Sequence, residues 1–258
     1  MPALSTPAVA ESESLNIMSF NVWAGSQPEA IARAILAAGE PDGTDAPAGT
    51  GVPASTGVPD VVALQELTPF AAQGLADELG HLYPYRALAP ASLAGGLGLL
   101  SRYPIVELDA GRVTGAGWRV RVFQIEFGER ALTVYNVHFP SWSFWGGAGA
   151  ASAIPERLQA GIRSRNELAE MIVEDMAART GPIVVTGDFN CTDRSEAYAT
   201  LTGSLADAHW SAGWGLGHTF PAYRGWYGRI PIMPRLVRLD MILHTDDLVA
   251  LDSHVGTD

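Results

Sequence analysis

The stretch Val184-Val185-Thr186-Gly187-Asp188-Phe189-Asn190 guides the interpretation of the whole chain. The apolar run from Pro182 to Val185 predicts a buried strand, and Gly187 lets the backbone turn sharply at its end. Asp188 and Asn190 follow two residues apart, so in an extended chain their side chains leave the same face. A carboxylate and a carboxamide placed together can orient a water molecule and hydrogen-bond an anion. An ordinary exit from a strand would also explain these residues, because turns favour Gly, Asp and Asn.

The composition is typical of a globular protein. The chain has 258 residues, of which 47% are hydrophobic and 17% are charged, enough for one large domain or two small ones. A net charge of −12 disfavours broad, sequence-independent binding of nucleic acid. It does not exclude a nuclease, because a bound divalent cation inverts the local field. Cys191 is the single cysteine, so no intrachain disulfide forms, and we interpret it as a small buried residue.

The termini and one internal segment differ from the rest in composition. Residues 1–14 resemble a loose leader without a signal peptide, and no run of about 20 apolar residues predicts a membrane span. Residues 40–59 are rich in Gly, Pro, Ala and Thr, which predicts a flexible insertion within one domain over residues 15–258. From these features we expect a cytoplasmic, monomeric protein.

The hydrophobic pattern predicts more strands than helices. The predicted strands cover residues 15–20, 60–64, 119–127, 131–138, 182–185, 236–243 and 248–253, and residues 95–102 form a Gly-rich strand entry. The predicted helices cover residues 28–38, 69–80 and 156–178. Strands with occasional helices, without strict alternation of the two, indicate an α/β fold with two packed sheets and outer helices.

Polar side chains stand at the ends of several predicted strands. They are Asn21, Glu66, Asn136, His138, Asp188 and Asn190, and Asp240 lies within the apolar run 239–243. A buried carboxylate such as Asp240 needs a partner or a cation. Each residue has an ordinary explanation when taken alone: a turn for Asn21, a helix cap for Glu66, a core histidine for His138. Asp240 in turn has Arg235 or Arg238 as a possible partner. It is much less plausible that all of these residues have ordinary roles, so we predict that they form a functional site.

Six short motifs carry these residues in a fixed order. They are Met18-Ser19-Phe20-Asn21-Val22, Val62-Ala63-Leu64-Gln65-Glu66, Leu100-Ser101-Arg102-Tyr103-Pro104-Ile105, Asn136-Val137-His138, Thr186-Gly187-Asp188-Phe189-Asn190 and Arg238-Leu239-Asp240-Met241-Ile242. Over residues 15–258 the chain resembles the endonuclease/exonuclease/phosphatase superfamily. That superfamily includes pancreatic deoxyribonuclease, abasic-site endonucleases, sphingomyelinases and inositol polyphosphate phosphatases. Each motif is weak alone, and six in the family's order form a strong signal.

The resemblance implies a fold, a cofactor and roles for the residues. The fold is a four-layer α/β sandwich of two packed mixed β-sheets flanked by helices. The activity is hydrolysis of phosphate ester bonds with Mg²⁺ or Mn²⁺, ions that suit hard oxygen ligands. Glu66 resembles the principal metal ligand, and Asn21 resembles either a nearby ligand or a residue that supports the ligands. Asp188 resembles the residue that orients or deprotonates the attacking water, and His138 and Asn190 the groups that hold the phosphate.

The end of the chain departs from the family's pattern. Members usually close with Ser-Asp-His and a last strand, whereas this chain ends Gly256-Thr257-Asp258. Asp258 matches the acid of that motif and is a predicted second metal carboxylate, and Asp240 resembles the residue that orients the histidine. We therefore expect a truncated sequence that lacks the last strand, binds metal and catalyses poorly. The alternative is a binding module that kept the fold and lost the chemistry.

The sequence leaves the class of substrate open. The segment from Gly213 to Pro221, with Arg235 and Arg238 after it, resembles a bacterial branch related to membrane-associated glycopeptide-resistance phosphatases. The acidic charge, and the aromatic loops with Trp142, Phe144, Trp145, Trp214, Trp226 and Tyr227, favour a small or lipid-linked phosphate ester over nucleic acid. A DNA or RNA endonuclease remains the alternative, because arginines such as Arg102 and Arg238 are candidates for binding the substrate.

Overall fold

The computed structural model describes residues 14–24, 26–38, 57–115, 117, 119–128, 130–141, 154–221 and 235–256, and every structural statement below concerns these residues. Several features singled out above lie outside them. These are residues 1–13 of the leader, residues 40–56 of the insertion, Asp258, and the aromatic residues Trp142, Phe144, Trp145, Trp226 and Tyr227.

The first sheet has four strands in the order β1-β2-β4-β3. The strands are β1 (Ile17–Asn21), β2 (Val61–Gln65), β3 (Tyr85–Ala89) and β4 (Leu97–Ser101). β1 and β2 are parallel, and the other pairs are antiparallel. Every residue of β2 is buried, as expected for a central strand covered on both faces.

The second sheet has six strands in the order β5-β6-β7-β8-β10-β9. The strands are β5 (Ile105–Leu108), β6 (Val120–Phe127), β7 (Arg130–His138), β8 (Ile183–Asp188), β9 (Ala206–Asp207) and β10 (Asp240–His244). β7 and β8 are parallel, and the other neighbours are antiparallel. Both sheets are therefore mixed.

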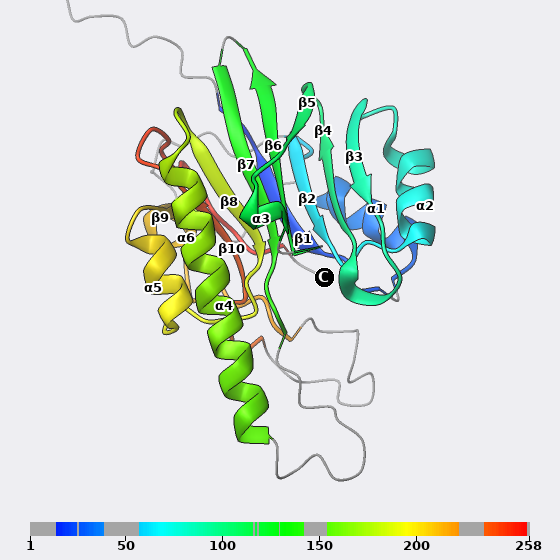
Figure 1. Ribbon diagram of the computed structural model, residues 1–258. Coiled ribbons are helices and arrows are strands. Elements are labelled where there is room, and N and C mark those ends of the chain that lie inside the picture. The colour runs from blue at the N-terminus through cyan, green and yellow to red at the C-terminus, as the bar shows by residue number, and fades with distance from the viewer. Residues whose placement is uncertain are drawn as a thin grey trace, which may run out of the picture.

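Helices cover the outer face of each sheet (Figure 1). They are α1 (Pro28–Ala37), α2 (Pro69–Leu79), α3 (Arg112–Gly115), α4 (Ile154–Ala177), α5 (Glu196–Thr202) and α6 (Ala208–Ala212), with a short 3-10 turn η1 (Leu93–Gly95) before β4. α1 and α2 lie on the first sheet, whereas α4 and α5 lie on the second (Figure 1). The helix–sheet–sheet–helix order confirms the predicted α/β sandwich of two mixed sheets.

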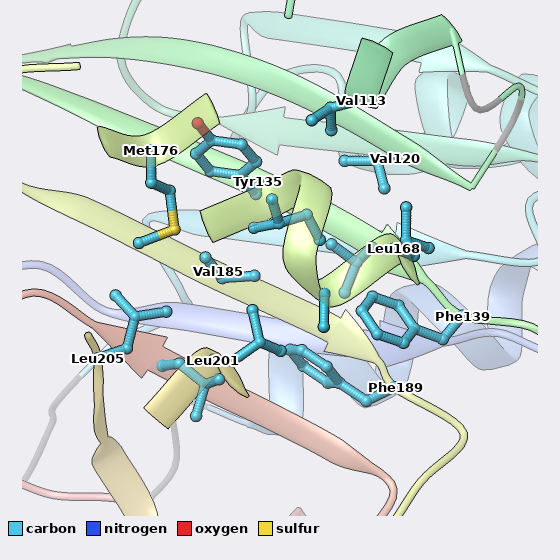
Figure 2. Close-up of a cluster of buried hydrophobic side chains, with 14 of the residues drawn as sticks. Val113, Val120, Tyr135, Phe139, Leu168, Met176, Val185, Phe189, Leu201 and Leu205 are labelled. Atoms are coloured by element: carbon cyan, nitrogen blue, oxygen red, sulfur yellow. The ribbon is translucent and has the colours of Figure 1, made fainter. Parts of the chain in front are cut away.

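Three clusters of buried side chains join the layers. One cluster packs α4 and α5 against the second sheet and includes Tyr135, Leu168, Val185 and Phe189 (Figure 2). A second packs α1 and α2 against the first sheet, and a third fills the space between the two sheets. Cys191 is 2% exposed in the first of these clusters, which confirms the prediction of a small buried residue.

Local sequence explains where the helices on the first sheet begin. Thr68 precedes α2, and its side chain accepts a hydrogen bond from the backbone N–H of Ala71, while Pro69 occupies the first helical position. α1 begins at Pro28 and buries Ile31 and Ile35, one turn apart, on its inner face. Both helices agree with the predicted ranges.

The structure corrects two of the predicted strands and adds two that were not predicted. Residues 248–253 form only an isolated bridge between Ser253 and Gly213, and Val249 and Leu251 are exposed rather than buried. The strand predicted from residue 236 begins at Asp240, because Val237 instead pairs with Phe220. The edge strands β3 and β5 were not predicted, since their burial does not follow a clean alternation.

Gly187 lies where β8 passes very close to β7. A Cβ atom at this position would be 1.9 Å from the carbonyl oxygen of Val137, and φ is +147°. We expect Gly187→Ala to lower the free energy of unfolding by about 1–3 kcal/mol, because the two strands must separate. Urea unfolding measures this, with Gly57→Ala as a control, since a Cβ there would meet nothing within 4 Å. Equal stability of the two variants would contradict this account.

Candidate active site

Six of the predicted site residues meet at one edge of the two sheets. Asn21 ends β1, and Glu66 follows β2, its parallel neighbour. His138 ends β7 and is in register with Asp188, which ends β8. Asp240 begins the antiparallel strand β10 directly opposite Asp188. The sixth residue, Asn190, follows β8 by two positions.

Asn21 links the two sheets at this edge. Its Nδ2 donates to Oε1 of Glu66 at 3.1 Å and to Oδ2 of Asp188 at 2.9 Å. Its own Oδ1 accepts the backbone N–H of Trp23 at 3.0 Å, which fixes the orientation of the amide. Nε2 of His138 lies 3.9 Å from Oε1 of Glu66 and 3.8 Å from Oδ2 of Asp188. Two carboxylates, an amide and an imidazole therefore form one continuous cluster.

The turns that carry these side chains have unusual backbone conformations. Glu66 has φ +58°, Asn190 has φ +46° and Trp23 has φ +48°, all in the left-handed region. Such residues cost on the order of 1 kcal/mol or more each, and they concentrate at functional sites. The turn at Asn190 is held by its own N–H, which donates to Oδ1 of Asp188 at 2.8 Å, and by its Nδ2, which donates to the carbonyl of Phe139 at 3.0 Å. Asp188 and Asn190 are thus fixed relative to each other.

A buried layer of amides supports the cluster from below. Nδ2 of Asn136 donates to the carbonyls of Leu64 and Gly98 at 3.1 and 2.8 Å, and its Oδ1 accepts from Nε2 of Gln65 at 2.8 Å. Asn136 and Gln65 are both fully buried. These bonds join β7 to β2 and β4, so they fix the spacing of the sheets directly beneath His138 and Glu66. Asn136 therefore has a structural role.

Burial sets the protonation of the acidic residues. Burial raises the pKa of Asp188 to about 6, although hydrogen bonds from Asn21 and Asn190 act to lower it. It raises the pKa of Asp240 to about 7, and the charge of Asp188 opposite acts in the same direction. Oδ1 of Asp240 is buried and has no hydrogen-bond partner among the described residues. Burial also lowers the pKa of His138, despite the nearby charge of Glu66.

The donor atoms at this edge suit a hard divalent cation. Glu66 offers a carboxylate, and Mg²⁺ is commonly held by one or two carboxylates while it keeps several waters. Asn21 turns its Nδ2 to this carboxylate and its Oδ1 to the N–H of Trp23, so it supports Glu66 and does not offer an oxygen of its own. In the described part of the chain, no three His, Cys, Asp or Glu side chains are placed to hold a metal ion together. Asp258, the predicted second metal carboxylate, lies outside the described residues. The residues present thus fit an ion of the Mg²⁺ type with few protein ligands.

Two predicted substrate-binding residues do not reach the cluster. Arg102 pairs with Asp60 at 3.1 Å, at the opposite end of β2 from Glu66. Arg238 is 6% exposed and donates to both carboxylate oxygens of Asp207, at 2.8 and 2.6 Å. Both arginines are therefore engaged with carboxylates, and their assignment to the substrate stays a prediction from the sequence. Arg238 is also not the partner of Asp240.

Arg119 is a cation near the cluster that the sequence did not single out. Its carbonyl accepts the backbone N–H of His138 at 2.8 Å, and its charge helps to lower the pKa of that imidazole. Burial lowers the pKa of Arg119 itself, so its side chain is partly removed from water. Arg119 stands just before β6, and only the pairing of β6 with β7 brings it beside His138. The sequence predicts the two neighbouring strands that pair here, but nothing in it marks Arg119 as a residue of the site.

The Arg238–Asp207 pair holds the segment that leads into β10. Tyr198 also donates to Asp207, whose remaining bonds cap α6. We expect Arg238→Met to lower the free energy of unfolding by about 3–5 kcal/mol, because it leaves a buried carboxylate without its cation. Arg112→Met is the control in urea unfolding. It breaks an exposed pair with Glu174, which contributes at most about 1 kcal/mol. Similar losses in the two variants would contradict this role.

The stabilisation from this pair should depend on pH. Although burial raises the pKa of Asp207, the hydrogen bonds and charge of Arg238 outweigh it, so the pKa is lowered overall. A carboxyl group whose pKa is lower in the folded state than in the unfolded state stabilises the fold fully at pH values above its unfolded pKa. This stabilisation is lost as the pH falls through the pKa of the folded state. The destabilisation caused by Arg238→Met should therefore shrink at acidic pH.

Comparison with known proteins gives the same fold. The chain is similar to sphingomyelinase C from Streptomyces griseocarneus, with 23% identity over 92% of this chain and 85% of that one, and a TM-score of 0.57. It is similar to a beta-hairpin deletion mutant of beta toxin from Staphylococcus aureus, with 16% identity over 95% and 92% of the two chains, and a TM-score of 0.62. It is also similar to a 3′ phosphatase, NExo, from Neisseria bound to a product DNA hairpin. The identity is 14% over 90% of this chain and 87% of that one, and the TM-score is 0.58.

The family follows from the sequence itself. No curated protein matches the chain. No helix in the described segments has the length and apolar character needed to cross a membrane. The family model described as "Endonuclease/Exonuclease/phosphatase family" matches residues 18–258, nearly the whole chain, and the likeness identifies no branch within that family. With the site at the edge of its two sheets, this chain belongs to the endonuclease/exonuclease/phosphatase family.

Proposed function

We propose that the protein hydrolyses phosphate ester bonds with the help of a divalent cation. The observation that carries the proposal is the contact of Asn21 with both Glu66 and Asp188, with Nε2 of His138 within 3.9 Å of each carboxylate. Members of this family are generally metal-dependent hydrolases of phosphate esters. The cluster offers the oxygen donors and the base that such a reaction needs.

Glu66 is the principal residue proposed to hold Mg²⁺ or Mn²⁺, with Asn21 beside it. When bound, the ion would neutralise charge on the phosphate oxygens. Asp188 is proposed to orient the attacking water through Oδ2, the oxygen that faces Asn21 and His138, and to accept its proton. A carboxyl with a pKa of about 6 is a competent proton acceptor near neutral pH.

The remaining residues are proposed to hold or position the reacting groups. His138 and Asn190 flank Asp188 and are assigned to the phosphate oxygens. Asp240 is assigned a positioning role, because its buried Oδ1 is an acceptor that can orient a donor of the site. Its backbone N–H is anchored by the hydroxyl of Thr219 at 3.2 Å, which holds the carboxylate opposite Asp188.

A small or lipid-linked phosphate ester is the proposed substrate class. The net charge of −12 opposes a polyanion, and Arg102 and Arg238 are engaged with carboxylates away from the cluster. A nuclease activity is the second candidate, supported by Arg119 beside His138 and by the similar fold of a phosphatase bound to DNA. The glycopeptide-resistance branch remains a prediction from the sequence.

A parallel substrate screen tests this proposal. p-Nitrophenyl phosphate, bis-p-nitrophenyl phosphate and supercoiled plasmid are each incubated with Mg²⁺ or Mn²⁺ and with EDTA. We expect metal-dependent release of p-nitrophenol with little nicking of the plasmid. Strong nicking at low salt that Glu66→Ala abolishes would favour the nuclease instead. No metal-dependent turnover in any arm would contradict the proposed function.

A further inference from the structure

A cavity of about 170 Å³ lies between the edges of the two sheets. Its lining includes Ala89, Gly95, Leu97, Glu107, Gly117 and Arg121. Four of these six residues are small or apolar, and the two charged ones come from β5 and β6. The cavity has no role in the site described above.

Strand register places this cavity beside the catalytic cluster. Leu97 pairs with Gln65, the residue before Glu66. Arg121 pairs with Asn136, and the preceding pair of Val120 and Val137 leads directly to His138. The backbone of Ala94, next to Gly95, acts to raise the pKa of His138, so this turn lies near the imidazole. A molecule whose phosphate lies at His138 therefore has the cavity as its immediate neighbour.

The two charged residues of the cavity offer complementary hydrogen bonds. Nη2 of Arg121 donates to Oε2 of Glu107, and the two side chains are 26% and 42% exposed. The guanidinium of Arg121 carries five N–H donors, and its contact with Glu107 uses Nη2 alone, so donors remain for an acceptor in the cavity. The carboxylate of Glu107, in contrast, only accepts. A hydroxyl group both accepts and donates, whereas a second phosphate would be repelled by Glu107.

We propose that this cavity binds a hydroxyl-bearing alcohol portion of the substrate, a polyol or a sugar, through Arg121 and Glu107. The inference rests on the proposed function, since it places the ester phosphate at His138. The cavity holds the equivalent of about five or six water molecules at about 30 Å³ each, which suits a group of a few hydroxylated carbons. The small residues Gly95 and Gly117 leave this space open.

The test compares substrates that differ only in hydroxyl groups. Glycerol phosphate is paired with propyl phosphate, and their p-nitrophenyl diesters serve as the matching diester substrates. We expect kcat/KM to favour the glycerol compounds about tenfold or more, since a hydrogen bond to a charged group has this effect. Arg121→Met and the nearly isosteric Glu107→Gln should both bring that ratio close to one. Arg130→Met, which removes an exposed arginine at the far end of the β6–β7 hairpin, should keep it.

The outcomes separate this inference from the proposed function. Turnover of both substrates with a ratio near one in the unaltered protein would overturn the cavity assignment and leave the hydrolase intact. If neither substrate is hydrolysed, the cavity assignment is tested by calorimetric titration of the protein with glycerol phosphate and with propyl phosphate. A preference for glycerol phosphate that Arg121→Met and Glu107→Gln remove would support the cavity assignment. Equal binding of the two compounds would overturn it.

Discussion

Replacement of Asp188 by asparagine is expected to lower kcat by at least about 10²-fold, with a smaller change in KM. The asparagine keeps the shape of the side chain but cannot accept a proton from the attacking water. Asp188 is fixed by hydrogen bonds from Asn21 and Asn190, so it acts at a defined position between the two sheets. Steady-state hydrolysis of bis-p-nitrophenyl phosphate with Mn²⁺ measures the effect.

The control for this substitution is Asp193→Asn. Asp193 is exposed and lies five residues further along the chain, so its replacement should leave kcat unchanged. Urea unfolding of both variants shows whether the fold is kept. A folded Asp188→Asn variant with the kcat of the unaltered protein would remove Asp188 from the proton transfer.

Replacement of Glu66 by glutamine is expected to abolish the response to metal. A ligand at 100 times its dissociation constant stabilises a folded protein by about 2.7 kcal/mol, so Mn²⁺ at that level should raise the Tm of the unaltered protein by several degrees. The glutamine loses the negative charge next to Asn21, and the rise in Tm should disappear together with metal-dependent turnover. Differential scanning calorimetry with and without Mn²⁺ measures this.

Glu126→Gln serves as the control for the metal response. Glu126 is an exposed residue of β6, and its replacement should leave the Mn²⁺-induced rise in Tm in place. If Glu66→Gln kept the same rise, the ion would bind elsewhere and Glu66 would not be its principal ligand.

The strand ends were predictable because their polar residues follow apolar runs directly. Asn21, Glu66, His138 and Asp188 each stand where such a run stops, and parallel pairing of β1 with β2 and of β7 with β8 brings these ends to one edge. The chemistry of the cluster thus follows from local sequence and the order of the motifs. The positive φ angles of Glu66 and Asn190 were not predictable, because neither residue is glycine.

The arginines show what local sequence does not contain. Arg102 and Arg238 both lie in motifs of the family, yet antiparallel pairing of β4 places Arg102 at the far end of its sheet, next to Asp60. Arg238 contacts Asp207, which is 31 residues away in the sequence, because β10 pairs with β9. Arg119 has no motif and reaches His138 through strand pairing alone. Which cation lies near the cluster is therefore decided by the direction and order of strands.

The dependence of hydrolysis on the cation tests the central claim most directly. The initial rate of p-nitrophenol release from bis-p-nitrophenyl phosphate is measured against Mn²⁺ concentration for the unaltered protein and for Glu66→Gln. We expect the rate of the unaltered protein to rise to saturation with Mn²⁺, to return to background with EDTA, and to stay at background in Glu66→Gln at every concentration. A rate that is independent of Mn²⁺, or one that Glu66→Gln retains, would contradict a metal-dependent hydrolase built on this cluster.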